Sequence, residues 1–550
     1  MVHQLSHGGG AGDGFHTGRG GGVAHRGPGH HGAQAQGAAV VGAEKKTPGG
    51  ILRELERIIE SARPAFKQER SLARGRRLAL SQLLCLGRHT VTGLICASGR
   101  QFRDWSADYR LFSGERFDKD EVFTAIRREA SDHLGEDEEV VCAMDDSLMR
   151  KSGRRIPGAG RLRDPLSPPF RVNLAWGLRF VQTSMIVPPR AKEAPGRAVP
   201  IDFVNAPVPK KPGKNSAPES WEKYLAERER SNISRVGAGR IRKLRRNLDG
   251  DERTAKKKLL MAVDNRFTNR KVFRSIPERT VLIGRLRHDA RLYYLPEAED
   301  RPGGKGRKKS YGERAPTPEA IRKDEAIPWQ RVPVFAAGRM HEFKVKALSP
   351  LLWQPAGADK PLKLVVIAPL SYRPSKKSKV LYRMPAYLAC TDPEVPLEKI
   401  VRAYVWRWEI EVNFRDEKQL LGLGEAQVWN KNSVNNDPAF VAATYAMLLL
   451  AGLKAFPHKN ISIPPPKWRK KQKPRLSTQD LISQLRAELW GKAIGYDGNI
   501  EGEVQQQPEK YKEAPVADGN FRGFRENQAV AQNALKLYPH IPHAVLYATG

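Results

Sequence analysis

One helical segment restricts what this chain can do more than any other feature of its sequence. In YVWRWEIEVNFRDEK, residues 404–418, a phenol, a guanidinium, a carboxylate and an ammonium group occur at Tyr404, Arg407, Glu411 and Lys418. At roughly 100° per residue these positions fall within about 60° of arc, so they form one stripe on one helix face. A carboxylate between two cations is a poor core pattern and a good one for holding a metal ion beside a phosphate. The stripe therefore predicts a helix that faces a polar site.

Two alternatives bear on this stripe. Glu409 is a second acid close to Glu411, but two residues on a helix correspond to about 200° of rotation, so the two acids cannot share a site. Only Glu411 lies on the face of Arg407 and Lys418. The other alternative is a solvated helix face of i,i+4 ion pairs, the common explanation of mixed charges. We favour the site because a solvated face leaves Tyr404 unexplained.

Two β-rich runs earlier in the chain end in aspartate. The run EEVVCAMDDS ends in Asp145 and Asp146, and KKLLMAVDNRF carries Asp264, 147 positions before Glu411. Two-metal phosphoryl transfer needs carboxylates that converge from separate elements, because two Mg²⁺ ions about 4 Å apart must share hard oxygen ligands. Adjacent strand residues point to opposite faces, so only one of Asp145 and Asp146 can face such a site. The alternative for Asp264 is a strand-terminating turn.

The charge of the chain indicates a polyanionic partner. The 550 residues carry 95 Lys and Arg against 60 Asp and Glu, a formal net charge of +35. Nucleic acid is the expected partner of such a chain, and a membrane-surface or ribosome-associated protein is the alternative. With 40% apolar residues the chain is long enough for two or three domains with a sizeable core.

Cysteine usage and the apolar runs favour a cytoplasmic location. The four cysteines form no C-x-x-C pair, so neither a disulfide framework nor a zinc site is indicated. The longest apolar run, 440–453, is too short to span a bilayer comfortably. It follows Asp437-Pro438, a good N-cap and N1 pair, and predicts a buried helix. No charged region followed by an apolar one opens the chain, so secretion is not indicated.

Over roughly residues 75–455 these motifs resemble the DDE transposases of bacterial insertion sequences, in the branch with the Y-(2)-R-(3)-E-(6)-K signature. The stretch DDSLMRKSGRRIPGAGRLRDPL resembles the D-D-T motif of that family, with Ser147 in place of Thr. VDNRF followed by TVLIGRLRHDARLY resembles its second motif. The GRHTVTGLI stretch is similar to the part of the family that helps bind the element ends.

The resemblance implies an α/β fold with a ribonuclease-H-like mixed-sheet core, interrupted by a β-rich insertion, preceded by a helical DNA-binding region and followed by a helical tail. Residues 1–48 are rich in Gly and His and cannot bury enough surface to offset ordering entropy, so we expect disorder there. The expected division is a tail at 1–48, a helical region at 49–135, the core at 136–286 and 397–456, the insertion at 287–396, and a basic linker with a helical region at 457–550.

The resemblance also implies roles for individual residues. Asp145, Asp264 and Glu411 would be catalytic and would hold two Mg²⁺ ions, for which Mn²⁺ can substitute; Asp145 takes the first place of the D-x-S/T pattern, and Asp146 is the alternative. The DNA-phosphate contacts of the family correspond to Tyr404, Arg407 and Lys418. Candidates for stacking a flipped base are Trp329 and Trp353, although a Trp in a β-run is more often part of a core.

The implied activity is cut-and-paste transposition: metal-dependent strand cleavage at element ends, followed by strand transfer into target DNA. The family implies double-stranded DNA as partner, a homodimer on DNA, and the bacterial cytoplasm beside the nucleoid. One alternative is an inactive or domesticated copy that only binds DNA, and another is a structure-selective nuclease with the same core. Three basic runs, 240–246, 301–309 and 467–473, either follow the DNA backbone or are solvated loops.

Overall fold

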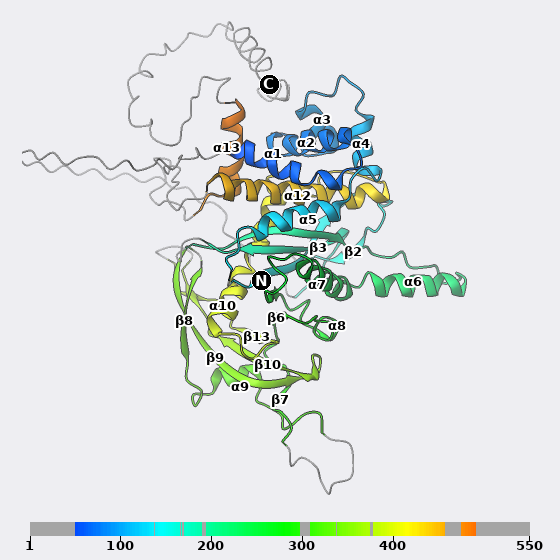
Figure 1. Ribbon diagram of the computed structural model, residues 1–550. Coiled ribbons are helices and arrows are strands. Elements are labelled where there is room, and N and C mark those ends of the chain that lie inside the picture. The colour runs from blue at the N-terminus through cyan, green and yellow to red at the C-terminus, as the bar shows by residue number, and fades with distance from the viewer. Residues whose placement is uncertain are drawn as a thin grey trace, which may run out of the picture. The chain divides into compact units, whose positions relative to one another are not determined.

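A mixed sheet of eleven strands, flanked by helices, forms the centre of this α/β protein (Figure 1). The computed structural model describes residues 50–136, 138–164, 167, 170–189, 194–297, 309–336, 338–373, 378–456 and 475–490. All of them belong to one of two compact units, Pro48–Gly550. The predicted tail at 1–48, the basic linker and the end of the chain after 490 lie outside the described residues. The α/β class that the sequence predicted is confirmed.

The first helices bury apolar residues at helical spacing. Ile51, Leu55 and Ile58 recur at i, i+4 and i+7 and are fully buried in the core that α12 (Lys431–Ala455) shares. Asp118 and Thr90 begin two of the helices by accepting backbone N–H groups. The helical elements of residues 50–135 are α1 (Ile51–Ser61), η1 (Arg63–Ala65), α2 (Glu69–Leu84), α3 (Val91–Ala97), α4 (Ser106–Ser113) and α5 (Lys119–Ser131).

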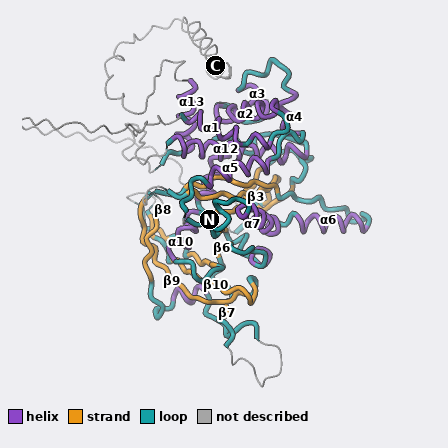
Figure 2. Tube along the Cα trace, viewed as in Figure 1, coloured by secondary structure: helices purple, strands orange, loops and turns teal. Residues whose placement is uncertain are grey.

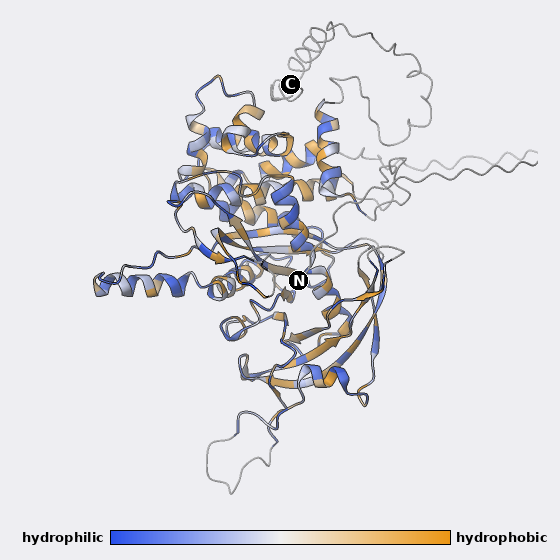
Figure 3. Ribbon diagram, turned by 180° about the vertical axis from the view of Figure 1, so that it is seen from behind, coloured by the Kyte–Doolittle hydropathy of each residue, from blue (hydrophilic) through white to orange (hydrophobic). Residues whose placement is uncertain are grey.

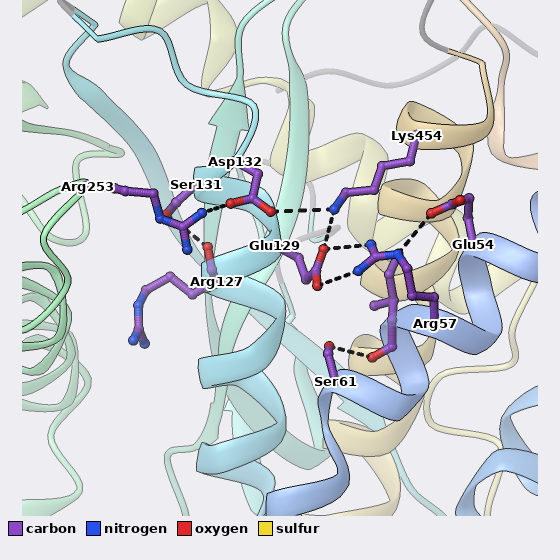
Figure 4. Close-up of polar contacts among 10 residues, drawn as sticks. Glu54, Arg57, Ser61, Arg127, Glu129, Ser131, Asp132, Arg253 and Lys454 are labelled. Carbon is purple, nitrogen blue, oxygen red and sulfur yellow. Dashed lines mark hydrogen bonds and ion pairs between the residues drawn. The ribbon is translucent and has the colours of Figure 1, made fainter. Parts of the chain in front are cut away.

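Glu129 of α5 joins three helices (Figure 4). Its carboxylate accepts hydrogen bonds from Arg57 of α1 at 2.8 and 3.1 Å and from Lys454 of α12. Lys454 also lies 3.5 Å from Asp132, which pairs with Arg253. The ion pairs of Glu129 therefore connect α1 and α5 to α12, in addition to the apolar packing between these helices.

The central part of the sheet has the order β4-β3-β1-β5-β6. β3 is antiparallel to both β1 and β4, whereas β5 is parallel to both β1 and β6. The five residues of β5, LLMAV, are all buried, as expected for a parallel strand covered on both faces. A short strand, β2, adds to β3. These strands are β1 (Val140–Arg150), β2 (Gly160–Arg163), β3 (Leu174–Val187), β4 (Arg197–Asn205), β5 (Leu259–Val263) and β6 (Thr280–Arg285).

Most strands of the predicted insertion at 287–396 extend this sheet. β13 pairs antiparallel with β6, and β10, β9 and β7 follow in order, with β8 paired to β9. β11 and β12 form a two-stranded sheet of their own. The elements here are β7 (Leu292–Tyr293), α9 (Pro318–Lys323), β8 (Gln330–Ala336), β9 (Arg339–Trp353), β10 (Gly357–Ile367), β11 (Ser371–Tyr372), β12 (Leu381–Tyr382) and β13 (Ala386–Cys390).

Helices cover the sheet on both faces (Figure 2). Val141 and Ala143 of β1 pack in one apolar cluster with α10 and α11, while Cys142 and Met144 pack in the other with α5 and α7. The strand alternation thus separates two cores. The remaining helices are α6 (Pro218–Arg230), α7 (Ile233–Asp249), α8 (Arg270–Phe273), α10 (Leu397–Trp406), α11 (Glu409–Gln419) and α13 (Thr478–Trp490).

Two strand predictions are wrong in extent. β1 does not end at the acids but continues to Arg150, because it keeps its antiparallel partner β3 after losing its parallel neighbour β5 beyond Met144. The apolar runs 171–180 and 181–188 by themselves predict two paired strands, but they contain the single strand β3. No turn residue separates Phe180 from Val181, and β1 and β4 pair along its two edges.

The start of α12 also differs from the prediction. Asn430 is the N-cap and accepts two backbone N–H groups, so the helix begins at Lys431 and encloses Pro438. Among the described residues α12 alone is long and apolar enough to cross a membrane, but 89% of its apolar window is buried inside the protein. This confirms the predicted buried helix. The four cysteines, Cys85, Cys96, Cys142 and Cys390, are all free.

Candidate functional site

Parallel pairing of β1 and β5 places two of the predicted acids side by side. Met144 of β1 lies opposite Val263 of β5, so Asp145 and Asp264 are the residues that follow this pair on the two adjacent strands. Alternation puts Asp145 on the face of Val141 and Ala143, and Asp264 on the face of Leu260. Both aspartates therefore project toward the face of the sheet that α10 and α11 cover.

The third acid reaches the same face from α11. Arg407 Nη1 donates to Asp145 Oδ2 at 3.0 Å and lies 3.9 Å from Glu411 Oε1, so one guanidinium group contacts both carboxylates. Asp145 is 8% exposed. Burial raises the pKa of Asp145 well above its ordinary value, the charge of Asp264 adds to this rise, and Arg407 opposes it. The structure thus places Asp145 beside Asp264 in the sheet and links Asp145 to Glu411 through Arg407.

Asp264 also makes the turn that the alternative interpretation predicted. Its Oδ1 accepts the backbone N–H of Arg266 at 2.8 Å, and its carbonyl accepts the hydroxyl of Thr268 at 2.8 Å. Within the described residues its Oδ2 makes no hydrogen bond or ion pair. One carboxylate oxygen therefore shapes the turn, and the other is left for a ligand.

Asp146 points to the other face of β1, away from these acids. Its carboxylate lies 3.0 Å from Arg266 Nε and 3.5 Å from Arg179 Nε. Burial raises the pKa of Asp146, and the two guanidinium groups oppose the rise. Sequence reasoning did not identify these two arginines as part of the site. A signal for Arg266 was present in its position two residues after Asp264, at the end of a strand.

The predicted stripe spans two helices. α10 ends at Trp406 and α11 begins at Glu409, and the backbone N–H groups of Ile410 and Glu411 bond three residues back. Both residues of the junction keep right-handed helical dihedrals, so the direction of the chain is preserved. Tyr404 packs partly buried against the apolar cluster of this face. The ammonium group of Lys418 lies 5.9 Å from the ring centre of Phe414, and burial lowers its pKa.

A buried polar cluster behind α11, which the sequence analysis missed, determines the rotation of this helix. Asn413 donates to Ser184 of β3 at 3.1 Å and accepts from Tyr445 of α12 at 3.2 Å. Asp416 accepts the hydroxyl of Thr478 at the start of α13 at 2.7 Å. Two polar residues three positions apart on an otherwise apolar helix face were the available signal. These contacts orient Glu411, which lies on the opposite side of α11.

The other predicted contact residues have different surroundings. Trp353 packs edge-on against Phe273, with ring centres 5.1 Å apart. Trp329 is 36% exposed, with the ammonium group of Lys346 4.5 Å above its ring. In the basic run 240–246 of α7, Arg240 pairs with Asp202, and Arg245 is 2% exposed. These two arginines have structural partners, while the runs at 301–308 and 467–473 lie outside the described residues.

The donor set fits a hard divalent cation in its chemistry. The carboxylates of Asp145, Asp264 and Glu411 outnumber the one guanidinium group, Arg407, that contacts two of them, and Mg²⁺ prefers carboxylate oxygens. In the described part of the chain, however, no three His, Cys, Asp or Glu side chains are gathered closely enough to hold a metal ion. Arg407 lies between Asp145 and Glu411. The assignment of the three acids as metal ligands stays a prediction.

Comparison with known proteins leaves the function to be argued from these residues. No protein-family model matches the chain, and no curated protein matches it either. The fold, the register of β1 and β5, and the contacts of Arg407 are therefore the observations on which a function can be based.

Proposed function

We propose that this protein is a DDE transposase, which cleaves DNA at the ends of a mobile element and joins the freed strand to target DNA. One observation carries the proposal. The parallel register of β1 and β5 sets Asp145 beside Asp264 on the face where Arg407 bridges Asp145 to Glu411 of α11. This register and these contacts support a site in which three acids that lie far apart in sequence act together.

The sheet supports a ribonuclease-H-like core for this site. An antiparallel half, β4-β3-β1, is followed by a parallel half, β5-β6, and the acids follow in the order strand, strand, helix. After β6 the chain passes through the insertion, returns to the sheet as β13 beside β6, and continues into α10.

Each residue of the site has a role in the proposed reaction. Asp145, Asp264 and Glu411 would hold Mg²⁺, for which Mn²⁺ can substitute, and such ions activate water and stabilise the departing 3′ oxygen. Arg407 would exchange Asp145 for a DNA phosphate, since a guanidinium group binds either oxyanion bidentately. Tyr404 and Lys418 would position the same strand without reading its sequence.

The proposed partner is double-stranded DNA. A formal charge of +35 favours a polyanion over a neutral or basic partner. A homodimer on DNA follows from the need to pair two element ends, and the proposed location is the bacterial cytoplasm beside the nucleoid. Trp329, partly exposed, is the better placed of the two tryptophans to stack a flipped base.

Excision from a plasmid that carries the native flanking DNA tests the proposal. Glu411→Gln is expected to abolish excision, because it removes one of the three carboxylates. Glu409→Gln is the matched control, since Glu409 lies two residues away and pairs with Arg475 of the segment before α13. The control is expected to excise like the unchanged protein.

Other outcomes would change the assignment in different ways. Excision by Glu411→Gln would remove Glu411 from the site. Binding of end DNA by the unchanged protein without cleavage would favour a binding-only relic. Cleavage without end specificity and without joining would favour the structure-selective nuclease.

A further inference from the structure

We propose that Arg179 and Arg266 form a second DNA-phosphate site on the face of β1 opposite to Asp145, and that Asp146 holds the two guanidinium groups in place. The site would take a phosphate of the DNA strand that enters the active site. The identity of the ligand, a DNA phosphate, rests on the proposed function. The existence of the site rests on the contacts of Asp146 with the two arginines.

The three side chains form a compact, half-buried cluster. Arg266 contacts both carboxylate oxygens of Asp146, with Nε 3.0 Å from Oδ1 and Nη1 3.3 Å from Oδ2. Arg179 of β3 approaches Oδ2 at 3.5 Å. The side chain of Asp146 is 10% exposed, that of Arg179 17% and that of Arg266 36%. Asp146 is therefore shielded, and Arg266 is the member that solvent reaches.

The charges in this cluster do not balance. Two guanidinium groups share one carboxylate, and within the described residues neither arginine has another carboxylate within ion-pair distance. A partly desolvated cation without a counter-ion is costly, so the cluster favours one more anion. This excess of positive charge is what distinguishes the cluster from a structural ion pair.

The remaining donors of Arg266 suit a phosphate. Its Nε and Nη1 are used by Asp146, while Nη2 makes none of the hydrogen bonds in the described part of the chain. A planar guanidinium group can hold a carboxylate on one edge and a phosphate on another, which an ammonium group cannot do. Asp146 thus orients Arg266 in the way that an outer carboxylate orients a ligand.

The position of the cluster relates it to the three acids. Arg266 lies in the turn that Asp264 forms directly after β5. β5 ends at Val263, whereas β1 continues to Arg150, so among the described elements β1 has no neighbour on its β5 side beyond Met144. A DNA strand that crosses this open edge would meet the carboxylates on one face and Arg266 on the other.

The salt dependence of DNA binding measures the proposed contact directly. A fluorescein-labelled duplex of mixed sequence is titrated with the full chain, without divalent metal, over a range of KCl concentrations. The logarithm of the binding constant falls with the logarithm of the salt concentration. Loss of one phosphate contact makes this slope less steep by about 0.9. Arg266→Gln and Arg179→Gln are each expected to show this loss. Arg266→Lys is expected to keep the slope, because it keeps the charge, while binding more weakly.

Two further variants separate this effect from charge removal and from misfolding. Arg331→Gln removes an exposed arginine that pairs with Glu342 on the β8–β9 hairpin, and its slope is expected to match that of the unchanged protein. Asp146→Asn keeps both arginines, so it is expected to keep the slope while excision falls. Should Arg266→Gln fail to fold, the other two variants still test the site. A reduced slope in Arg179→Gln together with an unchanged slope in Arg266→Lys would support it.

The outcomes separate this inference from the proposed function. An unchanged slope in Arg266→Gln and Arg179→Gln, with excision present in the unchanged protein, would overturn the phosphate site alone. A reduced slope without any excision by the unchanged protein would support the site and refute the transposase. Absence of DNA binding by the unchanged protein would overturn both.

Discussion

Glu417 is the most unusual single residue of the signature segment. Its side chain is fully buried, and within the described residues neither carboxylate oxygen has a hydrogen-bond partner. Burial raises the pKa of Glu417 to about 8, and the nearby side-chain amide of Gln182, although outside hydrogen-bonding geometry, opposes the rise. It follows Asp416, which is hydrogen-bonded, so the polar cluster behind α11 includes one acid that the fold favours in its protonated form.

Replacement of this acid by its neutral isostere is expected to make the protein more resistant to alkali. The folded-state pKa of Glu417, about 8, is above the reference value of 4.5, so the unchanged protein loses stability as the pH rises from about 4.5 to about 8. Glu417→Gln avoids that loss. Its advantage in free energy of unfolding should grow by a few kcal/mol across this range, an order-of-magnitude figure.

Urea unfolding at the two ends of this pH range measures the effect. Glu60→Gln, at an exposed acid of α1, serves as the control and should show no such growth. An advantage of Glu417→Gln that is the same at both pH values would mean that the buried carboxyl is not protonated in the folded protein.

At the scale of elements, the junction of α1, α5 and α12 depends on the charge of Glu129. Burial opposes its ionisation, but hydrogen bonds from Arg57 and Lys454 outweigh burial and lower its pKa to about 2. Its contribution is therefore present above pH 4.5, the reference value, and is lost as the pH falls toward 2.

Glu129→Gln is expected to lower the free energy of unfolding by about 3 kcal/mol at neutral pH, because it removes the buried carboxylate that Arg57 and Lys454 share and leaves them only Glu54 and Asp132 as partners. The difference in free energy of unfolding between the variant and the unchanged protein should shrink as the pH falls below 4.5, the reference pKa of Glu129. Urea unfolding over an acid pH series checks this, with Glu56→Gln, from an exposed pair with Arg76, as control. A deficit that does not vary with pH would contradict the ionic role.

The helix α6 stands in contrast, because none of its residues is buried. It projects from the rest of the described chain (Figure 1) and carries hydrophilic and hydrophobic residues together (Figure 3). Trp221 and Tyr224 contact each other edge to face, and Leu225 is 53% exposed. A helix that buries nothing adds little to the free energy of unfolding, whatever its propensity.

Proline insertion distinguishes this helix from its neighbour. Ala226→Pro in α6 is expected to change the free energy of unfolding by less than about 0.5 kcal/mol. The same substitution at buried Ala238 of α7 should cost about 3 kcal/mol or more. Urea unfolding of both variants, with circular dichroism to confirm the lost helix, makes the comparison. A large loss for Ala226→Pro would show that α6 is part of the cooperative core.

At the scale of the whole molecule, α13 ties the two ends of the described chain together. Glu488 accepts the N–H groups of Ile51 at 2.8 Å and Leu52 at 2.9 Å, so an acid more than 400 positions away caps α1. Arg486 of the same helix donates to the carbonyl groups of Leu83 and Cys85 at the end of α2. An anion at a helix N-terminus also interacts favourably with the helix dipole.

Glu488→Gln is expected to lower the free energy of unfolding by about 1 kcal/mol, because the amide offers one acceptor for two N–H groups and carries no charge. Glu60→Gln, near the other end of α1, is the control and should cost less than about 0.5 kcal/mol. Equal costs for the two variants, measured by urea unfolding, would show that the remote cap is not needed.

Much of the fold was predictable where the deciding interactions are local. The β-rich runs that carry Asp145 and Asp264, and the helical character of residues 404–418, follow from local sequence patterns. Ser477 and Asp480 have the sequence spacing of a capping box ahead of an apolar stripe, and the structure contains it: Asp480 accepts the N–H of Ser477 at 2.8 Å, and Ser477 Oγ accepts that of Asp480 at 3.3 Å. Each of these patterns involves residues within a few positions of one another.

What the sequence determined by itself was therefore the kind of element and the residue types in the site. The tertiary structure alone decided which arginines pair with each acid. Asp145 pairs with Arg407, and Asp146 pairs with Arg179 and Arg266, because β3, β5 and α10 lie on particular sides of β1. It also decided that β1 continues to Arg150 and that β13 joins β6. These outcomes depend on partners far away in the chain, and local periodicity carries no information about which remote strand or helix will supply the missing hydrogen bonds and counter-charges.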